Sequence, residues 1–188
     1  MTTIALVGTL DTKAEDYAWL KARLTEMGVN VLAVDVGSFS TADFADVSSD
    51  EVIDAAGEDA AKLRERRDRG EMMAVMGRGA ATIVQKLAEE GRIHGILAVG
   101  GSGGSSVAAP AMQAVPVGFP KLLLSTMASG DVSPYVGETD TTIMYSVVDV
   151  AGVNRISTMV LGNAAAGIAG MAKACLLYTS DAADEGLG

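Results

Sequence analysis

The sequence is poor in the residues that build many familiar functional sites. It has one cysteine, Cys175, and one histidine, His94, among 188 residues. A single thiol cannot form an internal disulfide or a thiolate cluster, and a zinc site or Ser-His-Asp triad would have to use His94. His94 lies in a predicted turn that enters a strand, where a solvated histidine is the ordinary interpretation. We therefore predict no metal site made by these two residue types.

Aromatic and basic residues are also scarce. Aromatics make up 4% of the chain, which argues against a stacking platform for single-stranded nucleic acid. Lys and Arg number 14 against 24 Asp and Glu, so the net charge is −10, and no basic run offsets it. A phosphate backbone would be repelled on average. We therefore expect no direct nucleic-acid partner.

Long hydrophobic runs are absent as well. Nowhere do 18 apolar residues follow one another, and the start at Met1 has neither the basic region nor the apolar segment of a secretory signal. The hydrophobic residues, 49% of the chain, are spread over short segments, as in parallel α/β sheets. We expect a soluble, cytoplasmic protein with no membrane partner.

Short apolar segments alternate with helical ones. Strands are predicted over residues 3–8, 29–36, 95–99, 121–125 and 141–146. Helices are predicted over residues 12–27, 59–90, 105–114 and 153–174, with a further short helix capped by Ser48 or Ser49. This order predicts one α/β domain over residues 1–174, with a Rossmann-like, doubly wound, mostly parallel sheet and helices on both of its faces.

Several helix boundaries can be predicted from capping and breaking residues. Thr12 and Glu15 have the spacing of a capping box, and Gly28 supplies the stop. Pro110 predicts that the helix after the glycine run is bent or begins late.

The helical segment 59–90 contains two unusual features. Its charged part, Lys62 to Arg69, is interpreted as a solvated face. Gly77 and Gly79 interrupt the apolar stripe that follows, which indicates a break, a close crossing or a ligand contact. Core packing is the interpretation we favour.

A glycine-rich run follows the third predicted strand. Gly100-Gly101-Ser102-Gly103-Gly104-Ser105-Ser106 stands between the apolar segment 96–99 and an alanine-rich, helix-capable segment. Glycines let the backbone approach a ligand closely, and free N–H groups at a helix start can face phosphate oxygens. A flexible linker is the alternative, but both flanking segments belong to the predicted core. The run therefore predicts a cradle for a phosphorylated small molecule.

The loops after the first four strands should meet at one edge, because parallel strands end on the same side of a sheet. Neither G-x-G-x-x-G nor a P-loop motif is present. The candidate ligand-binding residues are Gly8, Thr9, Asp11, Thr12 and Lys13 in the first loop, Asp35 and Gly37 in the second, Gly100, Gly101, Ser102, Gly103, Gly104 and Ser105 in the third, and Ser125, Thr126, Met127, Ser129 and Gly130 in the fourth.

Some of these residues suggest particular roles. Lys13, at a helix start, can meet an anion or be only a surface charge. Asp35, at the end of the second strand, occupies a position from which carboxylates bind ribose hydroxyls. Asp11, Asp131 and Asp140 could hold Mg²⁺ through water beside phosphates, although turn capping explains each of them as well. No catalytic residue is assigned, since no base accompanies the serines.

Together these segments resemble the N-terminal half of the Tm-1-like family, formerly an uncharacterised protein family. The resemblance rests on the motifs at 8–13, 35–37, 100–104, 120–121, 125–130, 135–140, 148–154 and 163–171. It implies a Rossmann-like ATP-binding domain, followed in complete members by a second α/β domain that this chain lacks. One departure is Ser105-Ser106, where the family pattern leads us to expect a threonine after the glycines, and a hydroxyl is retained.

The last fourteen residues, 175–188, resemble read-through of a sequencing adapter and are interpreted as a non-native tail. Because the second domain is missing, we expect an exposed apolar surface near the final helix and a homo-oligomer. ATP binding is the predicted function. The alternatives are half of a two-domain enzyme acting on a phosphorylated or carboxylated small molecule, and an interaction module that nucleotide stabilises.

Overall fold

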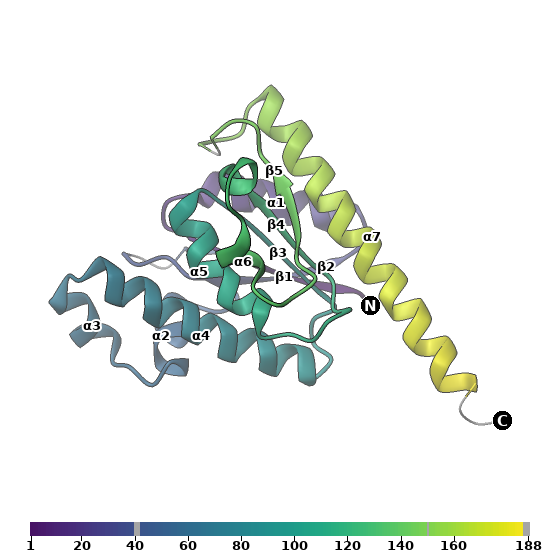
Figure 1. The fold of residues 1–188 in the computed structure, drawn as a ribbon, viewed down its shortest axis with the longest axis horizontal. Coiled ribbons are helices and arrows are strands. Elements are labelled where there is room, and N and C mark those ends of the chain that lie inside the picture. The colour runs from purple at the N-terminus through teal and green to yellow at the C-terminus, as the bar shows by residue number, and fades with distance from the viewer. Residues whose placement is uncertain (40–41, 150, 186–188) are drawn as a thin grey trace.

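The molecule is built on a five-stranded parallel sheet in the order β2-β1-β3-β4-β5 (Figure 1). This computed structural model describes residues 1–39, 42–149 and 151–185, so residues 186–188 of the predicted tail lie outside the described part. The strands are β1 (Thr3–Gly8), β2 (Asn30–Asp35), β3 (Gly95–Gly100), β4 (Lys121–Ser125) and β5 (Thr142–Tyr145). Every predicted strand is present within two residues of its expected ends.

Helices cover both faces of the sheet, which confirms the predicted doubly wound α/β fold. They are α1 (Ala14–Glu26), α2 (Ser49–Ala55), α3 (Ala60–Arg66), α4 (Arg69–Glu89), α5 (Ser102–Gln113), the 3₁₀ turn η1 (Thr126–Ser129), α6 (Ser133–Val136) and α7 (Arg155–Glu185). In Figure 1, α1 and α7 lie on one side of the strands and α4 and α5 on the other. The chain runs outward from β1 to β2, then crosses to β3 and continues in the opposite direction. The direction therefore reverses between β1 and β3.

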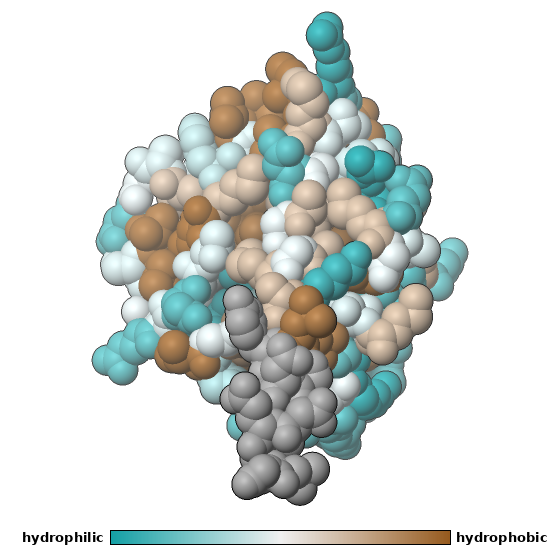
Figure 2. All heavy atoms as spheres, turned by 90° about the vertical axis from the view of Figure 1, so that its right-hand side faces the viewer, coloured by the Kyte–Doolittle hydropathy of each residue, from teal (hydrophilic) through white to brown (hydrophobic). Residues whose placement is uncertain are grey.

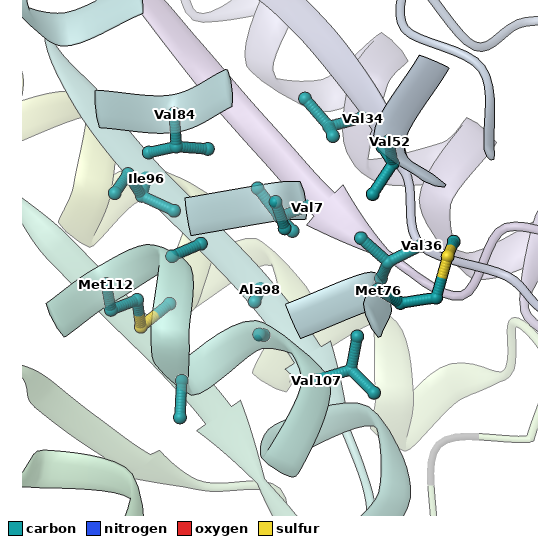
Figure 3. Close-up of a cluster of buried hydrophobic side chains, with 14 of the residues drawn as sticks. Val7, Val34, Val36, Val52, Met76, Val84, Ile96, Ala98, Val107 and Met112 are labelled. Carbon is teal, nitrogen blue, oxygen red and sulfur yellow. The ribbon is translucent and has the colours of Figure 1, made fainter. Parts of the chain in front are cut away.

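The strand side chains alternate between two cores, as the pleat requires. Ile4 and Leu6 of β1 face α1 and α7, and they join a cluster with Leu97, Leu124 and Ile168. The intervening strand residues face α2, α4 and α5. Figure 3 shows this second cluster, in which the labelled side chains are Val7, Val34, Val36, Val52, Met76, Val84, Ile96, Ala98, Val107 and Met112. Both faces of the sheet are therefore covered by buried apolar side chains, and only the edges where the strands end are left for a site.

The two glycines of α4 are explained by close packing against neighbouring elements. A Cβ on Gly79 would lie 1.8 Å from the carbonyl oxygen of Val52 in α2. A Cβ on Gly77 would lie 3.1 Å from the ring of Pro110 in α5. Among a break, a close crossing and a ligand contact, the geometry supports the close crossing. The charged segment before these glycines divides into α3 and α4 at Arg67, whose φ is +51°.

Two predicted helix starts were wrong. Lys13 is the N-cap of α1 and makes no capping hydrogen bond with its side chain, so the capping box from Thr12 does not form. The Thr12 hydroxyl instead lies 3.1 Å from that of Thr9. Helix α5 begins at Ser102, three residues earlier than predicted, and Pro110 lies inside it. The error arose because the glycines indicated a loop, whereas in the structure they form the first turn of the helix.

Helix α7 is long and packs one side on the sheet. Its buried residues include Leu161, Ala165 and Ile168. The segment Arg155–Leu177 would be long and apolar enough to cross a membrane, but core helices of compact domains pass the same test. The helix extends well beyond the predicted end at Ala174, so it takes in most of the 175–188 segment, whose origin stays a prediction.

Candidate functional site

The four predicted loops meet at the carboxyl edge of the sheet, which confirms their expected convergence. β1 and β2 end side by side, with Gly8 paired to Asp35 and the Val36 N–H donating to the Gly8 carbonyl at 2.9 Å. β3 and β4 end side by side, with Gly100 paired to Ser125. This edge thus brings the sequence-predicted residues together around the point where the strand order reverses, the position at which open α/β sheets bind ligands.

The hydroxyl of Tyr17, in α1, bridges β1 and β3 beyond the point where their hydrogen-bond ladder ends. The ladder of these strands ends at Val7 and Ala98, and the Tyr17 hydroxyl then accepts from the Val99 N–H at 2.9 Å. It lies 2.9 Å from the Val7 carbonyl oxygen and 2.8 Å from that of Val99, so it can donate to either. Burial raises the pKa of this phenol, which keeps it neutral. The sequence pattern alone places Tyr17 only in the apolar stripe of α1.

Gly8 is the residue that makes room for this tyrosine. A Cβ on Gly8 would lie 1.9 Å from Cζ of Tyr17. The first loop therefore needs glycine at this position because of contact with the protein itself, and the need does not depend on a ligand.

Asp35 organises the first two loops. It is fully buried, and its Oδ1 accepts from the N–H groups of Gly37 at 2.8 Å and Leu10 at 3.2 Å, while Oδ2 accepts from Ala42 at 3.1 Å. Burial raises the pKa of the carboxyl, and these three hydrogen bonds partly offset the rise. The predicted contact with a ribose would require some of these bonds to be given up, so the geometry favours a structural role.

Asp11 has an unused acceptor at this edge, as has Asp16 in the first turn of α1. Its Oδ2 accepts from the Phe39 N–H at 3.0 Å, whereas its Oδ1 is buried and has no hydrogen-bond partner in the described structure. Gly37 is needed beside it, since a Cβ there would lie 2.4 Å from the Asp11 Cγ. A buried acceptor without a donor is costly, so this oxygen has unused hydrogen-bonding capacity.

The glycine run places the start of α5 at the centre of the edge. Gly101 is the N-cap and no side chain caps the helix. Ser105 N–H donates back to the Gly101 carbonyl, but within the described residues the N–H groups of Ser102, Gly103 and Gly104 have no acceptor. Three uncapped N–H groups and the positive end of the helix dipole favour an anion at this position.

Two serines predicted as ligand contacts are used to fasten the loops instead. The hydroxyls of Ser105 and Ser125 are fully buried and lie 2.7 Å apart. The Ser125 hydroxyl also accepts from the Met127 N–H at 3.0 Å. The pair therefore joins the first turn of α5 to η1 and aligns the third loop with the fourth.

Arg69 adds a cation that sequence reasoning missed. A Cβ on Gly103 would lie 3.7 Å from Nη2 of this arginine, the first residue of α4. The side chain is exposed, and it forms no ion pair or hydrogen bond within the part of the chain that the structure describes. The sequence pattern assigns it to a solvated charged face, because 34 positions of sequence separate it from Gly103.

The remaining candidates lie around this centre. Thr126 is half-buried, with its hydroxyl 3.5 Å from the position of a Cβ on Gly101. Ser129 and Gly130 are exposed at the end of η1. Lys13 is partly buried at the start of α1 and has a polar partner of its own. These residues share the carboxyl edge of the sheet.

The carboxylates considered for Mg²⁺ do not gather. Asp140 lies at the opposite, amino edge of the sheet, where it pairs with buried Lys121 and accepts from the Gly118 N–H. That part of the magnesium hypothesis is wrong. Exposed Asp131 accepts from the N–H of Ser133 at 3.0 Å and from its hydroxyl at 2.6 Å. The described residues contain no group of three acidic, histidine or cysteine side chains that could hold a metal, so Mg²⁺ fits only as an ion carried by phosphates, with Asp11 beside it.

His94 also belongs to the amino edge. Its Nδ1 accepts from the Thr3 N–H at 3.0 Å, and burial lowers the pKa of the ring. The histidine thus has a structural bond rather than the purely solvated position predicted for it. A hollow of about 610 Å³ lies elsewhere, against β2 and the end of α4, and none of the four loops lines it.

Comparison with known proteins shows the family of the chain. The model of the uncharacterised protein family UPF0261, N-terminal domain, matches residues 2–176. The chain belongs to this family. A UPF0261 protein of Clostridium tetani is 44% identical over 171 residues, which cover 90% of this chain and 42% of that relative. A UPF0261 protein of Mesorhizobium japonicum is 41% identical, covering 92% of this chain and 43% of the relative.

A plant protein is also similar to this UPF0261 domain. The tomato protein named "ToMV resistance protein Tm-1(GCR237)" is 33% identical over 181 residues, which cover 88% of this chain and 24% of the tomato protein. The chain therefore spans about two fifths of the length of the two bacterial relatives and about a quarter of the tomato protein.

Proposed function

We propose that this UPF0261 domain binds ATP at the carboxyl edge of its sheet. The observation that carries the proposal is the start of α5, where the N–H groups of Ser102, Gly103 and Gly104 lie without acceptors among the described residues, at the β1/β3 reversal. Anions bind at such helix starts because backbone donors and the helix dipole act together. The phosphates would rest on this first turn.

Two side chains beside the start of α5, Arg69 and Thr126, could bind the phosphates of ATP. Arg69 would contact the terminal phosphates, because its guanidinium lies beside Gly103 and has no partner of its own in the described part of the chain. Thr126, beside Gly101, would add a hydroxyl donor. Arginine in place of the usual P-loop lysine is chemically adequate, since it offers several N–H donors in a fixed plane.

Asp11 could bind the ribose or a magnesium ion of the nucleotide. Its buried Oδ1 lacks a donor, and we assign to it a ribose hydroxyl or a water bound to Mg²⁺. Asp35 is not assigned to the nucleotide, because all its bonds go to loop N–H groups. Its contribution is to hold the first two loops in position.

Isothermal titration calorimetry with ATP, ADP and AMP, each with and without Mg²⁺, tests the proposal. We expect the affinity to fall as phosphates are removed. Gly103→Val should leave the fold intact, since a Cβ there meets nothing closer than 3.7 Å, but it should weaken ATP binding at least tenfold by blocking the cradle, which is about 1.4 kcal/mol. Gly170→Val, at a helical glycine with open space around it, is the matched control and should bind as the unsubstituted chain does.

Two results would contradict the proposal. Undiminished affinity in a folded Gly103→Val variant would remove the cradle, and no heat with any nucleotide would remove the nucleotide itself. The second result would favour the alternative of an enzyme half, which the length of the relatives supports, because groups from the rest of the chain would then complete the site. Titration with small phosphorylated or carboxylated acids would test that alternative.

A further inference from the structure

Helix α7 has an outer side that no other element covers within the described residues. Six of its exposed residues from 156 onward recur at alternating spacings of three and four, which places them on one stripe. They are Ile156, Met159, Asn163, Ala166, Gly170 and Lys173. The stripe faces away from the buried residues Leu161, Ala165 and Ile168, which pack on the sheet. It therefore forms a second contact surface on the same helix.

The composition of the stripe is unusual for a solvated helix face. Ile156 is 48% exposed and Met159 57% exposed, Ala166 and Gly170 are small, and Asn163 and Lys173 are its two polar members. Figure 2, which looks onto this side of the molecule, shows hydrophobic and neutral side chains gathered there with few hydrophilic ones between them. The apolar end at Ile156 and Met159 and the small residues Ala166 and Gly170 suit close packing against another element, because small residues let two backbones approach.

The edge strand β5 comes before this helix in the chain. β5 is the last strand, so one side of its backbone has no strand partner within the described residues. Tyr145, at its end, is 44% exposed, and Val147, just beyond it, is 63% exposed. The segment after β5 leads directly into α7. We call Tyr145, Val147, Ile156, Met159, Ala166 and Gly170 the docking face.

The length of the relatives indicates what covers this face. The matched family model is an N-terminal domain that ends at residue 176, inside α7, and the bacterial relatives are more than twice as long as the part that this chain matches. In such a protein, the rest of the chain leaves from the end of the helix that carries the stripe. The rest of the chain is therefore the part of the protein best placed to cover the docking face.

We propose that the part of the protein that follows α7 docks on this face, packing against the outer side of α7 and the free edge of β5. The proposal concerns how the two parts of the chain are joined, and it does not depend on nucleotide binding.

The test uses the complete protein with a protease site inserted at residue 176. After cleavage, the two parts should co-elute as a 1:1 complex in gel filtration with light scattering. Ala166→Arg combined with Gly170→Arg should separate them, with an affinity at least tenfold weaker. The control is Ala61→Arg, a new arginine on exposed α3 in the opposite helix layer, which should change nothing. Cooperative thermal unfolding of the 188-residue chain with the double substitution shows that the domain still folds.

Other results would overturn the proposal. The parts could separate before any substitution, or the double variant could co-elute like the unsubstituted protein. A 2:2 complex that the double substitution converts to 1:1 would identify a second copy as the occupant. Binding of the 188-residue chain to anionic lipid vesicles that the same substitutions abolish would identify a membrane.

Discussion

The two edges of the sheet differ in how their polar groups are satisfied. At the amino edge, the buried Lys121 ammonium donates to the carbonyls of Pro116 and Phe119 and pairs with Asp140. At the carboxyl edge, the N–H groups that start α5 and the Oδ1 of Asp11 have no partner among the described residues. Unsatisfied groups cost stability, so their presence at one edge and not the other is the feature on which the ligand proposal rests.

The difference also separates two uses of glycine. Gly8 and Gly100 at the carboxyl edge are required by the protein, since a Cβ would meet Tyr17 in the first case and the backbone of Gly104 in the second. A Cβ on Gly103 would make only ordinary contacts, 3.7 Å from Nη2 of Arg69 and 4.0 Å from Cε of Met73. Substitutions at Gly8 and Gly100 should therefore lower the stability of the fold. A substitution at Gly103 should instead lower the affinity for the ligand and leave the fold intact.

The largest expected effect is on folding at the carboxyl edge. Gly8→Ala should destabilise the chain by about 3 kcal/mol or more, because the Tyr17 ring must leave a buried, hydrogen-bonded position. Chemical denaturation measures the change. Gly170→Ala is the control, and it should stabilise the helix by roughly 0.5–1 kcal/mol because its Cβ meets nothing. Similar stabilities for the two variants would mean that Tyr17 does not close the β1/β3 gap.

A smaller effect is expected at the amino edge. Lys121→Met should cost about 2–3 kcal/mol, because the substitution leaves two backbone carbonyls and the Asp140 carboxylate without their donor. ATP affinity should be unchanged within twofold when the folded fraction is taken into account. A loss of ATP affinity as large as the loss of stability, measured on the folded variant, would show that the two edges are coupled. The two edges would then not have separate roles.

Removing the cation beside α5 should affect binding alone. Arg69→Ala should weaken ATP about fivefold to tenfold, somewhat over 1 kcal/mol, since the contact is charge-assisted but exposed to solvent. Stability should change by less than about 0.5 kcal/mol, as for most surface substitutions. Arg78→Ala, which removes an exposed arginine further along α4, should leave the affinity unchanged at the same ionic strength. Equal losses in both variants would indicate a general charge effect.

Most of the fold could be predicted because the strands are short apolar runs with clear ends. The third and fourth strands, at 95–99 and 121–125, match the observed β3 and β4 within one residue. The start of α5 could not be predicted, since glycine disfavours helix interiors and indicates a loop. The helix begins there because tight packing of Gly100 against Gly104 takes precedence over local preference.

The site could be predicted only as far as strand order determines it. The edge and its four loops follow from parallel topology. The role of Tyr17 could not, because a buried tyrosine at helical spacing suggests core packing until the strand carbonyls that surround its hydroxyl are known. Arg69 was missed for a similar reason, since only the packing of α4 beside α5 brings it near Gly103.

The smallest expected effect is on the pH dependence of stability, where the two edges should act in opposite directions. Lys121 lowers the pKa of Asp140, so the folded state keeps that carboxylate ionised longer than the unfolded chain does, and its contribution is lost as the pH falls below about 4. Burial raises the pKa of Asp35, so the folded state binds a proton on this carboxyl more tightly than the unfolded chain does. The free energy of unfolding should therefore fall as the pH rises above about 4. Urea midpoints from about pH 3 to pH 6 at constant salt measure both slopes. Lys121→Met should flatten the acid limb only, whereas an unchanged acid limb in that variant would show that the ion pair at the amino edge does not contribute to stability.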